Sequence, residues 1–280
     1  MVRLLLLSAV PAFAAAVAGA TPLIERGEYL VAGPAGCGNC HTPFGPDGLD
    51  MTQDLGGRLV EENPMFTAYA PNITPASRIA GWSDDELARA IREGLRPDGS
   101  VIGPPMPFAM YRGLSDDDLL AIVAYLRTVP AVESDIPKSI YNIDLPPAYG
   151  PPIQTIAHPA EGVTVEYGAY IAGPVAHCME CHTPFGPQGP LLDTHLGVGG
   201  FEFRGPWGVS VASNLTSHPD DGIPGYTDDE LKLMITQGIR PDGTAMMPPM
   251  PYGYLAQMTP QDLDAVILYL RSLPPLPDPS

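Results

Sequence analysis

The residues of this chain best suited to chemistry are its four cysteines, which lie in two short elements of the same form. These elements are Cys37-Gly38-Asn39-Cys40-His41 and Cys178-Met179-Glu180-Cys181-His182. Two thiols one helical turn apart can add to the two vinyl groups of one haem, and the adjacent histidine can then reach the iron from the same side. The spacing therefore predicts two covalently bound haem c groups. Their expected protein ligands are Cys37, Cys40, His41, Cys178, Cys181 and His182.

Two other uses of paired cysteines are a zinc site and a redox dithiol of the thioredoxin kind. A zinc site normally takes its cysteine pairs from one small module, whereas these pairs begin at Cys37 and Cys178 and lie in opposite halves of the chain. A redox dithiol has no need of a histidine directly after both motifs. Both alternatives are therefore weaker than haem attachment.

The sequence around the two motifs is duplicated. The segment 27–46 matches 168–187 at an offset of 141, and Trp82-Ser83-Asp84-Asp85-Glu86-Leu87 matches Tyr226-Thr227-Asp228-Asp229-Glu230-Leu231 at an offset of 144. Two long matched blocks in the same order indicate two copies of one self-sufficient domain rather than a solenoid. We expect a first domain over residues 21–131, a Pro-rich linker over 132–160 and a second domain over 161–280.

Helix signals recur in both copies. Capping boxes begin at Ser83 and Thr227, and apolar residues at helical spacing follow each of them, as far as Leu95 in the first copy. A second helix is expected to begin at Ser115 and to end before Pro130, and its counterpart to begin at Thr259 with proline in the first helical position. No segment shows a convincing strand alternation, so helices are expected to dominate.

The second axial ligand of each iron is expected to be a methionine. Met106 and Met250 lie in Pro-Pro-Met-Pro segments and correspond at the offset of 144. A thioether on a proline-stiffened loop can close the far side of a haem, and His/Met ligation raises the reduction potential. The alternative is that both methionines only fill gaps in the core, a role that suits the unmatched Met110, Met246, Met247 and Met258.

The first twenty residues have the form of an export signal. Arg3 is followed by an apolar stretch, and small residues end the segment at Ala18-Gly19-Ala20. We expect residues 1–20 to be a signal peptide cleaved after Ala20. The alternative is an uncleaved membrane anchor, because the stretch from Leu4 to Ala20 has no charged residue and is at the short edge of what spans a bilayer. Only in that case would the protein be bound to the membrane.

The charge of the chain constrains its partners. It has 32 Asp and Glu against 14 Lys and Arg, a formal net charge of −18 at pH 7. Such a chain is repelled by nucleic acids and by anionic lipid surfaces, so neither is an expected partner. Proteins that dock to it are expected to present basic patches.

With these motifs in view, the chain resembles the class I diheme cytochromes c, including the cytochrome subunits that accompany bacterial periplasmic dehydrogenases. The resemblance rests on the two Cys-X-X-Cys-His elements, the Asp-Asp-Glu-Leu helices, the Met-Pro-Phe/Tyr loops and the Asn-X-Thr segments at Asn72 and Asn214. It implies an all-α fold of two tandem cytochrome c domains in the periplasm. In that family the Asn-X-Thr segment tends to lie near the haem propionates, and a plain turn is the alternative.

Two classes of function follow from these expectations. The favoured one is an electron carrier, not itself an enzyme, that passes electrons from a donor dehydrogenase to an acceptor cytochrome or terminal oxidase. The alternative is a diheme redox enzyme, such as a peroxidase or a thiosulfate-oxidising dehydrogenase. An enzyme would need an open or exchangeable iron site, whereas this sequence offers one matched methionine for each haem.

Overall fold

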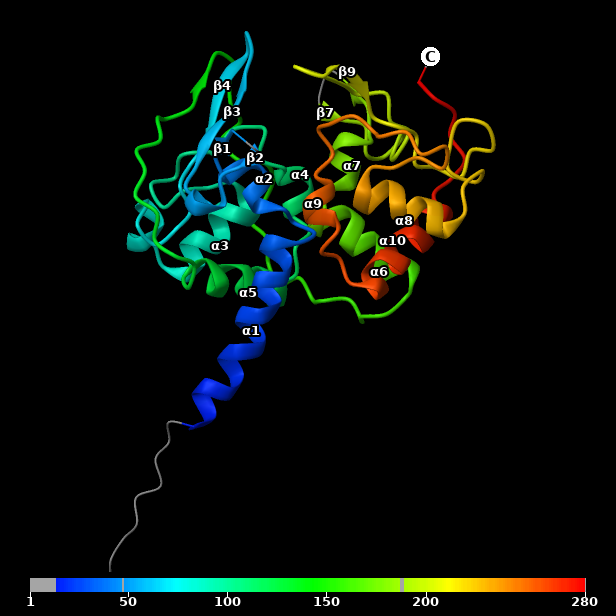
Figure 1. Ribbon diagram of the computed structural model, residues 1–280. Coiled ribbons are helices and arrows are strands. Elements are labelled where there is room, and N and C mark those ends of the chain that lie inside the picture. The colour runs from blue at the N-terminus through cyan, green and yellow to red at the C-terminus, as the bar shows by residue number, and fades with distance from the viewer. Residues whose placement is uncertain (1–13, 47, 187–188, 280) are drawn as a thin grey trace, which may run out of the picture.

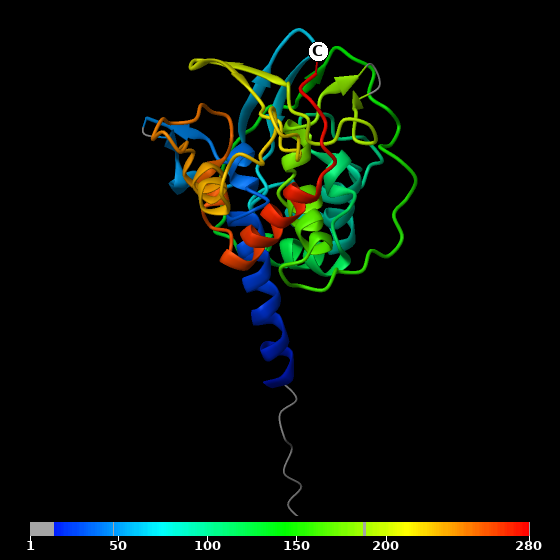
Figure 2. The same cartoon turned by 90° about the vertical axis from the view of Figure 1, so that its right-hand side faces the viewer.

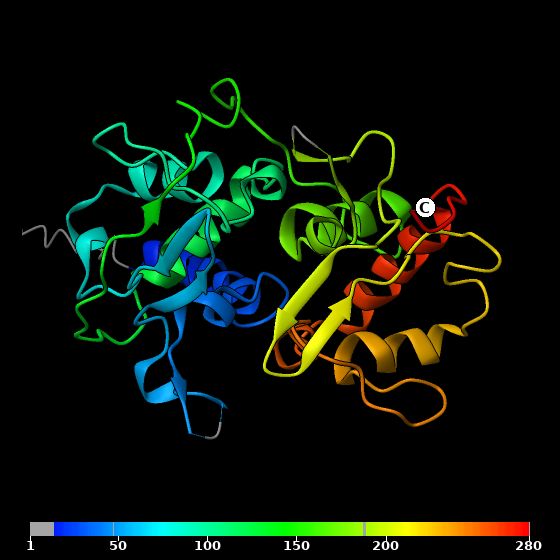
Figure 3. The same cartoon turned by 90° about the horizontal axis from the view of Figure 1, so that it is seen from above.

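The computed structural model describes residues 14–46, 48–186 and 189–279, and it consists of two similar halves that lie side by side (Figures 1 and 3). The elements of the first half are α1 (Ala14–Ala32), α2 (Cys37–His41), β1 (Phe44–Gly45), β2 (Gly48–Leu49), η1 (Met51–Gln53), β3 (Arg58–Glu62), β4 (Phe66–Ala70), η2 (Arg78–Gly81), α3 (Asp84–Glu93), α4 (Phe108–Tyr111), α5 (Asp116–Leu126) and β5 (Ile140–Tyr141). Those of the second half are α6 (Val165–Tyr170), η3 (Ile171–Val175), α7 (Cys178–Cys181), β6 (Phe185–Gly186), β7 (Gly189–Pro190), β8 (Glu202–Gly205), β9 (Gly208–Val211), α8 (Asp228–Gln237), α9 (Tyr252–Leu255) and α10 (Pro260–Ser272).

Each half is closed by a crossing of its first and last helices. Helix α1 packs against α5, and α6 packs against α10. The backbones approach so closely that a Cβ atom on Gly27 would collide with the carbonyl oxygen of Ala121, and one on Gly168 with that of Ala265. Because the obstacle is backbone in both cases, it cannot move aside as a side chain would, and only glycine fits at the two crossings.

The expected helix starts are confirmed. Ser83 and Thr227 form complete capping boxes with Glu86 and Glu230, and Pro260 occupies the first position of α10. Helix α3 is shorter than expected. It ends at Glu93 because Gly94 adopts a left-handed conformation with φ of 69°, so Leu95 lies beyond the helix and forms an isolated bridge with Val101.

The prediction of an all-α fold is wrong. The described residues contain strands β1 to β9 in four small antiparallel sheets, of which β3-β4-β5 is the largest. Two-residue strands are too short to show a period in the sequence. Strand β4 does alternate, with Phe66, Ala68 and Ala70 buried, but two of these three are alanines, which contrast little with the residues between them.

The Pro-rich segment after α5 lies against the first half. Its strand β5 pairs with β4, with Ile140 opposite Thr67 and Tyr141 opposite Phe66. Further along, the backbone carbonyl of Ile156 accepts a hydrogen bond from the Asp116 amide (2.9 Å). The segment therefore crosses the first half in contact with it, while the domain boundaries at residues 131 and 160 stay a prediction.

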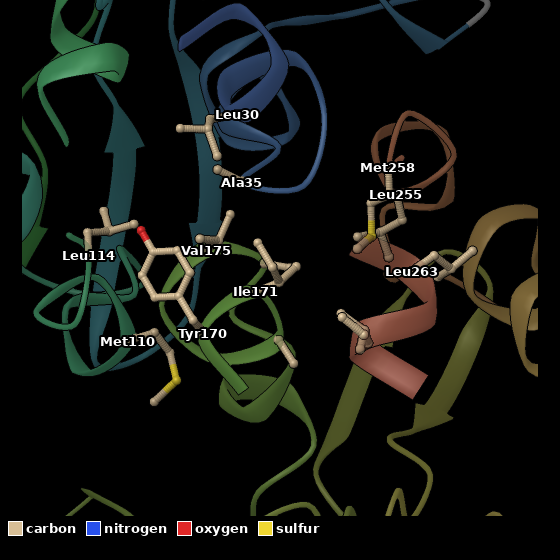
Figure 4. Close-up of a cluster of buried hydrophobic side chains, with 14 of the residues drawn as sticks. Leu30, Ala35, Met110, Leu114, Tyr170, Ile171, Val175, Leu255, Met258 and Leu263 are labelled. Carbon is tan, nitrogen blue, oxygen red and sulfur yellow. The ribbon is translucent and has the colours of Figure 1, made fainter. Parts of the chain in front are cut away.

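One hydrophobic core runs through both halves. Leu30, Met110 and Leu114 of the first half belong to the same buried cluster as Ile171 and Val175 of the second. Figure 4 shows side chains from both halves gathered in this cluster. Because buried apolar area is shared between the halves, we expect them to unfold together.

The N-terminal prediction falls mostly outside the described residues, since residues 1–13 are not described. Residues 14–20 form the beginning of α1, which extends away from the body of the molecule in Figures 1 and 2 and continues without a break to Ala32. No helix in the described ranges is both long enough and apolar enough to cross a membrane. Cleavage after Ala20 stays a prediction.

Replacing Gly168 by Ala should destabilise the protein by about 1–3 kcal/mol, because the added methyl group would force α6 and α10 apart. Thermal or urea unfolding measures this loss. The matched control is Gly253→Ala in α9, where a Cβ atom meets nothing within 4 Å. The control should unfold at the wild-type midpoint or slightly above it. Equal midpoints for Gly168→Ala and wild type would contradict the close crossing.

Candidate haem sites

The four cysteines lie on two short helices, and all four are partly buried. Helix α2 carries Cys37 and Cys40, and α7 carries Cys178 and Cys181. Each helix follows a residue in the left-handed region, Gly36 with φ of 54° and His177 with φ of 40°. All four cysteines are free thiols. Each pair thus presents two thiols within one helical turn, as the sequence predicted.

The surroundings of the first thiol in each motif are apolar. Cys37 and Cys178 pack against the shared hydrophobic core. Burial raises the pKa of the Cys37 thiol to about 12 and that of the Cys178 thiol to about 11. The thiols are therefore protonated at neutral pH, and their neighbours suit a large apolar group better than a charged one.

Both motif histidines are held in one defined tautomer. The Nδ1 atom of His41 donates a hydrogen bond to the carbonyl oxygen of Pro71, and that of His182 to the carbonyl oxygen of Ser213, each at 2.7 Å. A carbonyl can only accept, so the proton resides on Nδ1 and leaves a lone pair on Nε2. Burial lowers the pKa of both rings, which favours the neutral form that binds iron.

The Asn-X-Thr segments turn the chain directly after these two carbonyls. The Asn72 side-chain oxygen accepts hydrogen bonds from the backbone and hydroxyl of Thr74, both at 2.8 Å, and its amide donates to the Val132 carbonyl (2.6 Å). Asn214 makes the same turn with Thr216 (2.8 and 2.7 Å) and donates to the Leu276 carbonyl (2.9 Å). The contacts favour the turn role, through which each asparagine fixes the carbonyl that orients the histidine.

The two methionine loops have the same conformation. Pro107 has φ −83° and ψ 59°, and Pro251 has φ −86° and ψ 61°. Met106 and Met250 are half-buried and pack against the same core as the first cysteine of each motif. Met110 and Met258 are buried in that core, as expected for gap-filling residues, but Met246 is only half-buried and Met247 is exposed, so the prediction of a core role is wrong for these two. Iron ligation by Met106 and Met250 stays a prediction.

The residues present fit a haem. Each half combines two thiols one turn apart, an imidazole with its Nε2 lone pair available and an apolar lining. Beside the first motif, Arg58 Nε and the Tyr254 hydroxyl are buried donors that have no partner among the described residues. In the same described part of the chain, no three His, Cys, Asp or Glu side chains are grouped so that they could hold a metal ion.

Two tyrosines that sequence reasoning missed lie at contacts between the two halves, next to the Cys-X-X-Cys-His motifs. The Tyr111 ring contacts the His177 ring edge to face, with ring centres 5.7 Å apart, and so joins α4 of the first half to the start of α7. From the second half, the Tyr254 hydroxyl lies against Gly38 of the first motif. Neither tyrosine has a tyrosine at the matched position, because Tyr111 corresponds to Leu255 and Tyr254 to Met110. The duplication therefore gave no signal for them.

Comparison with known proteins relates the chain to cytochromes c. Residues 24–130 match the cytochrome c family. The fructose dehydrogenase cytochrome subunit of Gluconobacter japonicus is 30% identical over 90% of this chain and 53% of its own length. The quinone-type alcohol dehydrogenase cytochrome c subunit of Gluconobacter oxydans is 30% identical over 91% of this chain and 56% of its own length. A diheme cytochrome c-type protein of Cereibacter sphaeroides is 41% identical over 40% of this chain and 37% of its own length.

The chain spans about half the length of the dehydrogenase subunits that it matches. The family match covers the first motif with its surroundings, and the longer similarities continue through the second half. The chain therefore contains a cytochrome c domain at residues 24–130, and over about nine tenths of its length it is similar to the cytochrome c subunits of bacterial dehydrogenases.

Proposed function

We propose that this protein is a diheme electron carrier that takes electrons from a dehydrogenase and passes them to a cytochrome or terminal oxidase in the periplasm. The observation that supports two haems best is the repeated histidine geometry, in which His41 and His182 each donate from Nδ1 to a backbone carbonyl at 2.7 Å. A bound haem c would supply one-electron redox chemistry, in which no covalent bond is made or broken.

The residues of the chain would hold and tune that chemistry. Cys37, Cys40, Cys178 and Cys181 would anchor the haems through thioether bonds. The carbonyls of Pro71 and Ser213 keep the histidine rings in the orientation and protonation state that an iron ligand needs. Met106 and Met250 would complete six-coordinate iron, leaving no position free for a substrate. This ligand set favours a carrier over a peroxidase.

A dehydrogenase donor is supported by the names of the relatives, which are cytochrome subunits of fructose and alcohol dehydrogenases. Docking would be assisted by charge, because the chain carries a formal charge of −18. Exposed carboxylates stand at the start of α3 and α8. Asp84 and Asp228 pair with Arg127 and Arg271, Asp229 lies 3.9 Å from Lys232, and Asp85 faces solvent. Basic surfaces on the partner would complement these carboxylates.

The purified protein should contain two haems per chain by the pyridine haemochrome assay and by mass. Cys178→Ala/Cys181→Ala should contain one haem, and Cys37→Ala/Cys40→Ala should contain the other one, because each pair anchors its own haem. A wild-type count of one would contradict the diheme assignment. Two haems in either double variant would show that the replaced pair is not an attachment site.

Replacing Met106 or Met250 by Ala should lower the potential of one haem by a sizeable part of the about 0.8 V that axial ligands span. The same change should let the reduced iron of that haem bind carbon monoxide. Redox titration and the visible and near-infrared spectra measure both effects. Met65→Ala is the control, because Met65 is 53% exposed and lies on the tip between β3 and β4. Unchanged potentials in the Met106 and Met250 variants would refute methionine ligation.

Electron transfer to a basic soluble cytochrome c should slow at least about tenfold when the ionic strength rises from 0.01 to 0.5 M, because salt screens the attraction between the two proteins. Stopped-flow kinetics at several salt concentrations measures this. The rate with an acidic acceptor should instead stay constant or increase. Equal salt dependence with both acceptors would exclude electrostatic docking.

A further inference from the structure

The two halves contact each other through a pair of matched hydrogen bonds. The Tyr29 hydroxyl of α1 donates to Asp262 Oδ2 at the start of α10 (2.5 Å), and the Tyr170 hydroxyl of α6 donates to Asp118 Oδ2 at the start of α5 (2.7 Å). Tyr29 and Tyr170 correspond at the offset of 141, and Asp118 and Asp262 at the offset of 144. These are the two offsets of the duplication. Each half therefore gives one tyrosine and receives one at the equivalent place.

Each tyrosine also completes the cap of a helix that belongs to the other half. In a capping box the third helical residue reaches back to the N-cap amide, as Glu86 and Glu230 do in α3 and α8. In α5 and α10 this residue is an aspartate. The N-cap amides instead donate to the tyrosines, Ser115 to the Tyr170 hydroxyl (3.2 Å) and Thr259 to the Tyr29 hydroxyl (3.1 Å).

The carboxylates in these contacts are buried, so their partners matter. Asp118 is 2% exposed and Asp262 is 3% exposed. Asp118 also forms a two-pronged ion pair with Arg26 through Nε (2.7 Å) and Nη2 (2.9 Å). Removing a partner from a buried carboxylate strongly destabilises the folded protein. Burial, reinforced by Asp262, raises the pKa of Tyr29 to about 12, so this hydroxyl remains a donor at neutral pH.

Two close contacts at glycine residues repeat the same symmetry. Gly33 lies next to the Gln257 side chain, and Gly113 lies against the Pro174 ring. Positions 33 and 174 correspond at the offset of 141, and positions 113 and 257 at the offset of 144. An interface in which residue i contacts j and the equivalent of j contacts the equivalent of i is isologous, the form found in two-fold symmetric dimers.

We propose that the two halves form an isologous interface inside one chain, and that Tyr29–Asp262 and Tyr170–Asp118 are positioning pairs that fix the first haem-attachment helix against the second. Both tyrosines lie shortly before a motif, Tyr29 eight residues before Cys37 and Tyr170 eight residues before Cys178. Fixing these tyrosines therefore fixes the positions of α2 and α7, which lie on either side of the contact between the Tyr111 and His177 rings. Association of the halves stands independently of the proposed function, whereas the effect on the haems rests on it.

Association of the halves can be tested in the full-length protein by cutting the linker after folding. A specific protease site inserted between the exposed Gln154 and Thr155 separates the halves covalently. The cut protein should elute as one complex in size-exclusion chromatography. With Tyr29→Phe/Tyr170→Phe, which keeps both rings, the dissociation constant of the cut halves should rise at least tenfold. Tyr149→Phe is the control, since its hydroxyl donates to the Ile102 carbonyl on the same side of the cut.

A spectroscopic readout on the uncut, haem-loaded protein tests positioning itself. Two haems at a fixed short separation give a two-signed Soret band in circular dichroism. The band should lose at least half of its amplitude in Tyr29→Phe/Tyr170→Phe and be unchanged in Tyr149→Phe, with both haems retained in each. Cut halves that hold together equally well in wild type and double variant would overturn the positioning pairs, as would an unaltered Soret band. A haem count of one would overturn the proposed function, and the elution result would still decide the interface.

Discussion

The close crossing of the first and last helix in each half is the constraint on which the remaining contacts depend. At Gly27 and Gly168 the backbone of one helix lies directly against a carbonyl oxygen of the other, and any side chain at these glycines would push the two helices apart. Two residues further on, Tyr29 and Tyr170 emerge from these helices toward the opposite half. The Cys-X-X-Cys-His motifs begin eight residues after these tyrosines. A shift at either crossing would therefore displace both the interface and the motif.

The candidate haem sites depend on backbone carbonyls as much as on side chains. The histidine tautomer is set by Pro71 in one half and by Ser213 in the other, two residue types with no chemistry in common. Their carbonyls are placed by asparagine turns that also bind the chain after the last helix of each half. The segment after the last helix of each half thus contributes to the orientation of its motif histidine, although it lies far from the motif in the sequence.

Much of the local structure could be predicted from residue types. Ser83, Thr227, Ser115 and Thr259 begin helices because their side chains cap free backbone amides, and this effect acts over three or four residues. The strands could not be predicted in the same way. The core face of β4 contains two alanines, and strands of two residues, such as β1 and β6, are too short to show an alternation in the sequence. The end of α3 could not be predicted from the apolar pattern either, because the left-handed Gly94 ends the helix before Leu95, the last apolar residue of that pattern.

What the sequence determined by itself is the pair of Cys-X-X-Cys-His motifs and their duplication, because the spacing within a motif is a local property and the duplication is visible as a repeat. What only the tertiary structure decided is how the halves meet. The aspartates at the start of α5 and α10 look like ordinary first-turn acidic residues in the sequence, yet each is buried and bound by a tyrosine of the other copy that is distant in the chain. Such contacts depend on the relative placement of folded helices. No local spacing encodes that placement.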